Sequence, residues 1–287
     1  MTVNKILLLG AAGMLGNTLY RYFRDKTPHM VIGASRNQIV SENMHHSENA
    51  ILISGIDVEN IDALTQLLNK YRPDMVINCV GIIKQRDDAD DPLTVLPINA
   101  LLPHRLYQLC GLLGARLIHF STDCVFSGKK GMYTEDDIPD AYDLYGRSKL
   151  LGEVSATNAI TIRTSLIGHE LDSNKSLVNW FLSQSETVLG YHRAIFSGLP
   201  TVEIARIIDQ YIISDLSLSG LVQLSAQPID KYTLLSLIKA TYGKTIEIQP
   251  DDKVVIDRSL DSTSFKKQTG YQPPSWEELI SSMYDFH

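Results

Sequence analysis

The stretch KILLLGAAGMLG, residues 5–16, decides the fold, because an apolar run of strand length leads directly into three glycines with the spacing GxxGxxG. Backbone amides and the positive end of a helix can hold a pyrophosphate at such a turn. A side chain on the glycines would block the phosphate or the contact between helix and strand. The stretch predicts dinucleotide binding, against the alternative of an ordinary tight turn. The residues expected to contact the cofactor here are Gly10, Gly13, Met14, Leu15 and Gly16.

Outside this stretch, apolar runs of strand length alternate with amphipathic segments, which predicts parallel strands joined by helices. We expect an α/β fold, a Rossmann-type doubly wound parallel sheet, in residues 1–168. Residues 169–287 are mainly helical in pattern and predict a smaller C-terminal lobe that binds substrate, with part of the chain returning to the main sheet. Helices are expected at 12–25, 61–71, 98–114, 144–158, 177–190, 201–213 and 231–243, and strands at 5–10, 30–35, 51–58, 74–81, 115–122, 159–168, 220–225 and 245–250.

Composition excludes several classes of function. A formal net charge of −7 argues against a broad nucleic-acid surface, which needs clustered Lys and Arg. Cys79, Cys110 and Cys124 form no CxxC pair, so we expect reduced thiols in a cytoplasmic protein and neither disulfides nor a zinc site. The eight histidines show no metal-ligand spacing, and no apolar run is long enough to span a membrane.

The end of the second expected strand bears on the choice of cofactor. An acidic residue there would bind the adenosine ribose and favour NAD, whereas this chain has Ser35 and Arg36. Arginine can pair with a 2′-phosphate in bidentate fashion, so the sequence favours NADP(H), with NAD(H) as the alternative. Asp57 and Val58, closing the third expected strand, fit the adenine side of the cofactor, although Asp after a strand is also a common turn residue.

A catalytic group is expected in HFSTDCVFSGKKGMYTEDDIPDAYDLYGRSK, residues 119–149. Tyr145 and Lys149 are four residues apart on an expected helix, so both side chains lie on one face. A neighbouring ammonium and a cationic nicotinamide favour the phenolate, which predicts a lowered pKa and a tyrosine able to donate or accept a proton. The hydroxyl of Thr122, or failing that Ser121, would bind the same carbonyl oxygen of the substrate.

These features together resemble a known family. GAAGMLG (10–16), FSTDCVFSGKKGMYTEDDIPDAYDLYGRSKLLGE (120–153) and ITIRTSLIG (160–168) closely resemble the extended short-chain dehydrogenase/reductases, in particular their dTDP-4-dehydrorhamnose reductase-like branch. That branch carries STDxVFxG, YxE, YGxSKxxGE and RTS. The resemblance runs from about residue 4 to 280. It implies an oxidoreductase that uses NADPH to reduce a 4-keto group on a nucleotide-linked deoxysugar, a step in making surface-polysaccharide precursors.

The resemblance also implies roles for individual residues. Thr122 matches the active-site hydroxyl, Tyr145 the acid and Lys149 the ribose-binding lysine. Asp123, Val125 and Phe126 would shape the sugar pocket, although the last two can equally be core residues. Residues implied to line the cofactor are Asn78, Cys79, Val80, Gly81 and Asn99, the last of which can alternatively cap its helix.

Two departures from the branch leave the sugar open. Cys124 replaces the usual aromatic residue, and VGIIKQRDDADDP (80–92) replaces an alanine-rich loop. Lys84 in that loop, with Gln85 beside it, is a candidate contact to sugar or phosphate, or else faces solvent. Arg163 can be a buried ion-pair partner or a ligand contact.

The resemblance places the nucleotide diphosphate between the two lobes. Arg193 and Arg258 are candidates to bind it, against the alternative of solvated surface cations. No catalytic metal is expected, although the family admits a Mg²⁺ ion at a subunit contact. The implied partners are the nucleotide-diphosphate sugar and a second copy of the chain in a homodimer, with no nucleic acid and no membrane.

Two other functions stay open. One is an epimerase or dehydratase of the same superfamily that recycles tightly held NAD, for which Asp123 directly after Thr122 speaks and Arg36 does not. The other is a non-catalytic, NADP-binding regulatory subunit, as in the β subunit of methionine adenosyltransferase. An intact Tyr145–Lys149 pair does not separate the enzyme from such a subunit.

Overall fold

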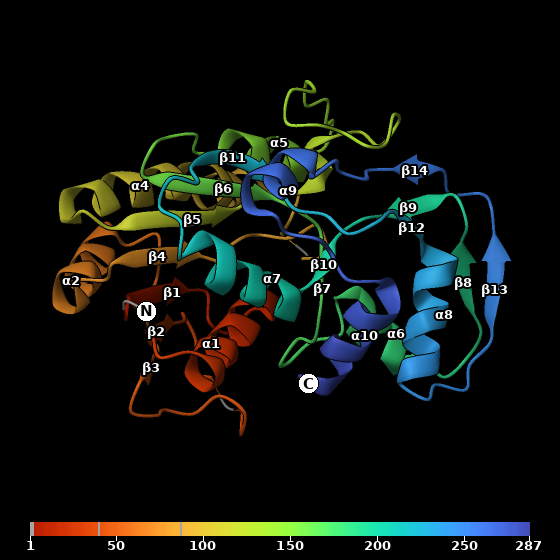
Figure 1. Ribbon diagram of the computed structural model, residues 1–287, viewed down its shortest axis with the longest axis horizontal. Coiled ribbons are helices and arrows are strands. Elements are labelled where there is room, and N and C mark those ends of the chain that lie inside the picture. Colours follow the sequence, from red (N-terminus) through yellow and green to blue (C-terminus); the bar gives the residue numbers. More distant parts are fainter. Residues whose placement is uncertain (1–2, 40, 87) are drawn as a thin grey trace.

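The computed structural model describes residues 3–39, 41–86 and 88–287. Its centre is a parallel sheet with the strand order β11-β6-β5-β4-β1-β2-β3 (Figure 1). The order reverses between β1 and β4, the crevice at which open α/β sheets bind ligands, so the predicted Rossmann-type fold is confirmed. The strands are β1 (Lys5–Leu9), β2 (Met30–Ala34), β3 (Ala50–Ile53), β4 (Met75–Asn78), β5 (Arg116–Phe120), β6 (Ala159–Arg163) and β11 (Gly220–Gln223).

Helices cover both faces of the sheet because successive strand residues point to opposite sides. Leu7 and Leu9 pack in one core with the first set of helices, and Ile6 and Leu8 pack in the other core with the second set (Figure 1). The first set is α2 (Ile61–Tyr71) and α4 (Leu102–Leu113), and the second is α1 (Met14–Lys26), α7 (Thr201–Ile207) and α10 (Trp276–Asp285). α5 (Leu144–Leu151) follows β5 and begins at an Asp143 cap.

The last third of the chain forms small sheets beside the carboxyl ends of the main strands (Figure 1). β13 pairs with β8, β9 lies between β12 and β14, and β10 pairs with β7, while β11 returns to the main sheet beside β6. These strands are β7 (Leu166–Ile167), β8 (Val188–Tyr191), β9 (Ala194–Phe196), β10 (Leu199–Pro200), β12 (Ile229–Asp230), β13 (Ile248–Asp251) and β14 (Ile256–Asp257). The remaining elements are α3 (Pro92–Leu96), α6 (Leu177–Ser183), α8 (Lys231–Thr241), α9 (Thr263–Thr269), the π-helical turns η1 (Pro97–Leu101) and η3 (Ile208–Ile212) and the 3₁₀ turn η2 (Asp123–Val125).

Two expected helices are too long. The helix expected at 177–190 ends at Ser183, and Val188–Tyr191 form β8 because this segment pairs with β13 from much later in the chain. The helix expected at 144–158 ends at Leu151, where Gly152 follows as the C-cap. Local periodicity gives no information on such distant pairing, so the boundary errors fall where tertiary contacts decide.

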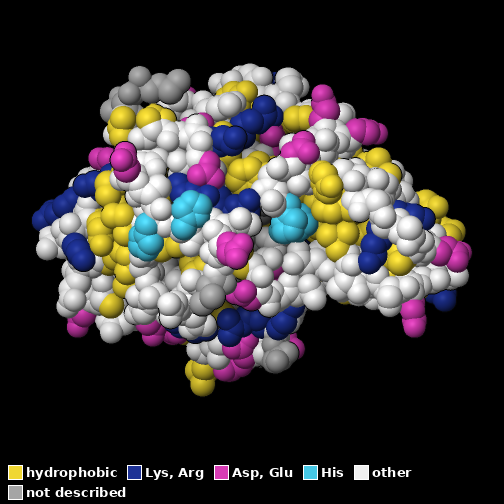
Figure 2. Space-filling model, turned by 90° about the horizontal axis from the view of Figure 1, so that it is seen from below, with side chains coloured by type: hydrophobic (Ala, Val, Ile, Leu, Met, Phe, Trp, Pro, Cys, Tyr) yellow, Lys and Arg dark blue, Asp and Glu magenta, His cyan; other side chains and the backbone are white. Residues whose placement is uncertain are grey.

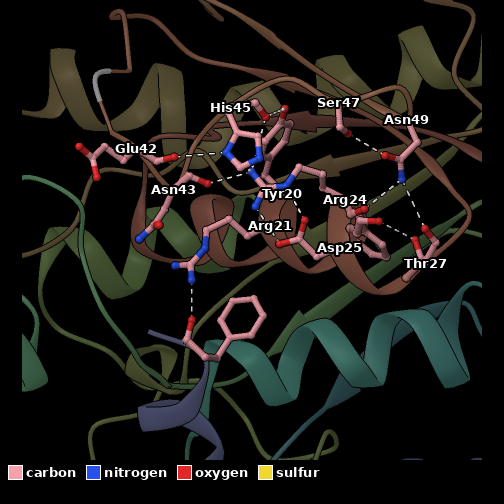
Figure 3. Close-up of polar contacts among 12 residues, drawn as sticks. Tyr20, Arg21, Arg24, Asp25, Thr27, Glu42, Asn43, His45, Ser47 and Asn49 are labelled. Atoms are coloured by element: carbon pink, nitrogen blue, oxygen red, sulfur yellow. Dashed lines mark hydrogen bonds and ion pairs between the residues drawn. The ribbon is translucent and has the colours of Figure 1, made fainter.

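The polar segment between β2 and β3 is anchored on α1 (Figure 3). Arg24 donates a hydrogen bond of 2.8 Å to the carbonyl of Asn43, and the Tyr20 hydroxyl donates one of 2.9 Å to the carbonyl of His45. Asn49 donates back to the carbonyl of Arg24 at 3.1 Å. These contacts hold residues 43–49 against the C-terminal half of α1.

The close packing of Gly16 in the glycine turn predicts a large loss of stability when a side chain is added there. A Cβ at Gly16 would lie 2.0 Å from the carbonyl oxygen of Gly10, and backbone atoms cannot move aside cheaply. Gly16→Ala should therefore lower the free energy of unfolding by about 3 kcal/mol in urea titration. Gly111→Ala in α4 is the control, because no atom lies within 4 Å of its added methyl, and it should raise stability by about 0.5–1 kcal/mol. Equal effects of the two substitutions would contradict the tight packing of this turn.

Candidate active site

The glycine turn joins β1 to α1 and is fastened to β2. The amides of Gly10 and Ala11 both donate to the carbonyl of Ala34, at 2.9 and 3.0 Å, and Gly10 has φ +83°. Gly13 is the N-cap of α1, where no side chain accepts from the helix. The positive end of α1 can therefore bind an anion such as a phosphate group. Met14 is partly exposed beside it, while the side chain of Leu15 is buried in the core.

Of Ser35 and Arg36 at the end of β2, the arginine is the one that faces solvent. Ser35 is buried, and its hydroxyl donates to the carbonyl of Asn37 at 2.6 Å. Arg36 is exposed. Asp57 is also exposed and accepts from the amide of Glu59 at 3.0 Å, which is the contact of a turn residue, and Val58 packs on the core. Arg36 is therefore the side chain at this strand end that is placed to meet a phosphate.

The loop after β4 is held against α5 by Asn99. Its side chain accepts from the amide of Ile82 at 2.8 Å and donates to the Ile82 carbonyl at 3.0 Å and to the Ser148 hydroxyl at 3.2 Å. A Cβ at Gly81 would lie 3.5 Å from Asn99 Oδ1 and 4.0 Å from Lys149 Nζ. Asn99 is thus a cross-link rather than a cap, and it keeps the backbone of the loop close to Lys149.

Two other residues of this strand end border the glycine turn. A Cβ at Gly10 would lie 3.1 Å from the carbonyl carbon of Cys79 and from a methyl of Val80. Asn78 is buried, and its side chain accepts from the amide of Val80 at 3.1 Å. The ends of β1 and β4 therefore meet, as the strand order requires.

Lys149 is buried, with 6% of its surface exposed, and it points to the tip of β5. Its ammonium donates a hydrogen bond of 2.6 Å to the carbonyl of Phe120. Burial lowers the pKa of Lys149 to about 8, and attraction to Glu153 and Cys79 only partly opposes this. The ammonium is therefore charged at neutral pH by a small margin.

Tyr145 lies beside Thr122, but its pKa moves in the direction opposite to the expected one. Burial raises the pKa of Tyr145, negative charge at Cys124, Asp123 and Asp143 raises it further, and a hydrogen bond with Thr122 lowers it. In the protein alone, burial thus outweighs neighbouring charge; the expected lowering requires both the Lys149 ammonium and a bound cationic nicotinamide, and it stays a prediction. Tyr145 is therefore a neutral phenol at physiological pH, the form that can donate a proton to a developing alkoxide.

The two hydroxyls at the β5 tip have different partners. Ser121 donates to Glu153 Oε1 at 2.7 Å, whereas Thr122 is the one that acts on the Tyr145 phenol. Thr122 also accepts from the amide of Cys124 and donates to Asp123, each at 3.1 Å. The structure thus favours Thr122 over Ser121 as the hydroxyl that reaches a substrate bound at Tyr145.

Lys84 comes to the same place from the loop after β4. Its ammonium forms a 2.8 Å ion pair with Asp143, the residue that caps α5, and lies 5.4 Å from the centre of the Tyr145 ring. About a third of its side chain is exposed, at 34%. Lys84 is therefore a cation at the open side of the site.

On the substrate side, Asp123 and Arg258 lie near one another. Burial raises the pKa of Asp123, and the charge of Arg258 opposes this. Arg258 donates to the carbonyl of Phe126 at 2.8 Å. Arg193 is exposed in the β8–β9 turn, and its carbonyl accepts from Ile256 of β14, the strand that leads to Arg258. Both arginines thus lie beside the small sheet of β9 and β14, Arg193 directly before β9 and Arg258 directly after β14.

Val125 and Phe126 lie in a core rather than in a pocket wall. Both are fully buried with Tyr133 and Leu260, and the rings of Phe126 and Tyr133 stack with centroids 4.1 Å apart. They can support the segment behind Asp123, but the neighbouring side chains leave them no open surface for a sugar. Arg163 is likewise enclosed, in a bidentate pair with Glu153 at 2.7 and 2.8 Å.

Sequence reasoning missed Glu153 and Asp143. Glu153 contacts Ser121 and Arg163, and Asp143 contacts Lys84 and the first turn of α5. A signal for Glu153 was present, because it follows Tyr145 and Lys149 at a second interval of four residues. Asp143 stands directly before the expected helix, where a carboxylate cap is common.

Histidines lie on the face that carries α1 and the C terminus (Figure 2). Among residues 3–39, 41–86 and 88–287, no group of three or more His, Cys, Asp or Glu side chains is arranged to hold a metal ion. In that part of the chain, no helix combines the length and apolar character needed to cross a membrane.

Comparison with known proteins identifies relatives of this arrangement. The family model described as RmlD substrate binding domain matches residues 4–188. The probable low-salt glycan biosynthesis reductase Agl14 of Haloferax volcanii is 31% identical over 166 residues, which cover 55% of this chain and 52% of that protein. Methionine adenosyltransferase 2 subunit beta of Rattus norvegicus is 29% identical over 154 residues, 52% of this chain and 41% of that protein. The chain thus spans about half or less of the length of these two relatives.

Two further relatives match over nearly their whole length. The dTDP-4-dehydrorhamnose reductase of Aggregatibacter actinomycetemcomitans is 22% identical over 304 residues, 97% of this chain and 98% of that protein. The crystal structure of dTDP-4-dehydrorhamnose reductase from Bacillus anthracis in complex with NADP superposes with a TM-score of 0.79 at 20% identity, covering 99% of both chains. The structural likeness extends the fold assignment to the C-terminal third.

The environment of Lys149 predicts an unusual titration. In protein labelled with ¹³C-lysine, one side-chain resonance should titrate with a midpoint near pH 8, while exposed lysines titrate near about 10.4. The ammonium form predominates below that midpoint and is lost as pH rises through it. Lys149→Met should remove this resonance and no other. A spectrum in which all lysines titrate above about pH 10 would contradict the burial described here.

Proposed function

The chain belongs to the RmlD substrate binding domain family, and on that premise we propose that it is an NADPH-dependent reductase of a 4-keto group on a nucleotide-linked deoxysugar. The observation that carries the proposal is the meeting of Tyr145 with Thr122 at the β5 tip beside buried Lys149. The reductases among its relatives support the same chemistry. Its place would be the cytoplasmic synthesis of surface-polysaccharide precursors.

The residues at the strand ends fit a dinucleotide. The helix end at Gly13 and the turn at Gly10 and Gly16 would hold the pyrophosphate through backbone amides. A Cβ at Gly10 or Gly16 would meet backbone atoms, so the turn requires glycine at these positions. Lys149 and the backbone at Gly81 would hold the nicotinamide ribose. Arg36 would pair with a 2′-phosphate, which favours NADP(H) over NAD(H). When bound, the reduced cofactor supplies a hydride to the carbonyl carbon.

Side chains of the protein would carry out the proton transfer that accompanies reduction of the ketone. Tyr145, kept neutral by burial, would donate its proton to the carbonyl oxygen as negative charge develops there. Thr122 would hydrogen-bond to the same oxygen and keep it in line with the phenol. The lysine ammonium would favour the phenolate left after transfer.

The substrate would lie between the main sheet and residues 169–287. Asp123 is suited to bind sugar hydroxyls, and Lys84, Arg193 and Arg258 are suited to bind the diphosphate, since Arg258 lies close to Asp123 and Lys84 lies over Tyr145. A homodimer is part of the proposal by family likeness.

A non-catalytic role is the second candidate. The match to methionine adenosyltransferase 2 subunit beta, over 52% of the chain, supports this candidate. Such a protein would bind NADP and a partner without turnover. An epimerase or dehydratase is less favoured, because Arg36 suits a dissociable NADP(H) better than a permanently held NAD.

The reductase proposal predicts NADPH oxidation with at least one member of a panel of dTDP-, UDP- and GDP-linked 4-keto-6-deoxysugars. Tyr145→Phe should lower kcat by about 10²–10⁴ because the proton donor is lost, while NADPH affinity changes by less than about threefold. Full turnover by Tyr145→Phe would overturn the assigned acid. Absence of oxidation with every sugar, together with co-purification of another protein, would favour the non-catalytic candidate.

Arg36 gives a separate prediction on cofactor choice. Arg36→Ala should weaken NADPH binding about 10- to 100-fold through loss of a charge-assisted pair and leave NADH binding nearly unchanged. Lys26→Ala, which removes an exposed cation at the far end of α1, is the matched control and should change neither affinity. Equal loss for both cofactors in Arg36→Ala would mean that this arginine does not recognise the 2′-phosphate.

A further inference from the structure

Three consecutive residues at the end of β5 each contact a different side chain from α5 or the residues just after it. These three side chains follow one another at intervals of four residues along the sequence. Lys149 donates a hydrogen bond to the carbonyl of Phe120, Glu153 accepts one from the hydroxyl of Ser121, and Tyr145 lies close enough to Thr122 for that hydroxyl to influence its pKa. The first and last of these contacts belong to the site already described. The middle one belongs to Glu153, which lies just beyond α5 with 10% of its side chain exposed.

We propose that Glu153 is a positioning residue of this site: its carboxylate fixes the β5 tip through Ser121 and supplies the negative charge that keeps Lys149 protonated. The inference rests on the proposed function, because it assigns Glu153 a role in the same site.

The contacts of Glu153 make it a rigid cross-link. One oxygen accepts from Ser121 at 2.7 Å and from Arg163 Nε at 2.7 Å, and the other accepts from Arg163 Nη2 at 2.8 Å. Arg163 in turn lies on β6, next to β5, with its guanidinium 5.3 Å from the Phe126 ring centre. A bidentate pair of this kind fixes orientation as well as charge. Ser121 is thus held away from the reacting face, which leaves Thr122 directed at Tyr145.

The charges around Lys149 also support a role for Glu153. The groups that act on its ammonium from packed elements are Glu153, the Cys79 thiol after β4 and the His119 imidazole on β5. Burial raises the pKa of Cys79 and lowers the pKa of His119, so both are neutral at physiological pH. Glu153 is the acidic side chain of these three, and it is held in an ion pair with Arg163. Because burial already brings the pKa of Lys149 to about 8, loss of the carboxylate charge would lower that pKa further.

The test compares three variants by ¹³C-lysine NMR. In Glu153→Gln the Lys149 midpoint should fall by about one pH unit or more, and kcat should be lost at lower pH than in the wild type. Ser121→Ala removes the hydrogen bond without changing charge, so its midpoint should stay in place while kcat falls about fivefold. If unpaired Arg163 prevents folding, Glu153→Gln combined with Arg163→Met removes both charges, and its midpoint should fall below that of the wild type by less than in Glu153→Gln, because loss of the guanidinium offsets part of the loss of the carboxylate.

The outcomes are separable from those of the proposed function. A Lys149 midpoint unchanged in Glu153→Gln, or in the folded double variant, would overturn the charge role. A kcat unchanged in Ser121→Ala would overturn the role in holding the strand tip. If no sugar nucleotide is reduced but the midpoint falls as described, the reductase proposal fails while Glu153 remains the group that sets the charge of Lys149.

Discussion

The site depends on a buried ammonium group at the end of a parallel strand. Removing a lysine charge from water costs several kcal/mol unless polar partners replace the lost hydration. The Phe120 carbonyl and the Glu153 carboxylate supply such partners to Lys149, one by hydrogen bonding and one by charge. The balance leaves a cation that is only just stable at neutral pH. This requirement explains why α5 must dock so closely on the tip of β5.

Close docking also sets the character of Tyr145. The helix face that buries Lys149 brings the phenol against Thr122, and the same burial raises the pKa of Tyr145. A phenol that keeps its proton suits reduction of a ketone, where the oxygen must receive one. Lys84 and Asp143 add a second, exposed ion pair at the open side. The paired and partly exposed ammonium of Lys84 thus lies at the open side of the site, and the ammonium of Lys149 is buried inside it.

Much of the sheet and the placement of Tyr145 and Lys149 on one helix could be predicted from the sequence, because the glycine turn and the four-residue spacing are local signals. The choice between Ser121 and Thr122 could not, since adjacent strand residues point to opposite faces and only tertiary contacts show which face bears Glu153. Phe126 was equally ambiguous, because its stacking partner and Leu260 come from other parts of the chain. Strand β8 was missed because its partner β13 lies far along the sequence.

The account requires the nicotinamide ring to lie against Tyr145 when the dinucleotide binds. The most direct test is a nuclear Overhauser effect between the nicotinamide C4 proton of bound NADP⁺ and the ring protons of Tyr145, with the tyrosine resonance assigned through Tyr145→Phe. The account predicts this contact in the wild-type protein. Bound NADP⁺ that shows contacts to the glycine turn but none to Tyr145 would contradict it.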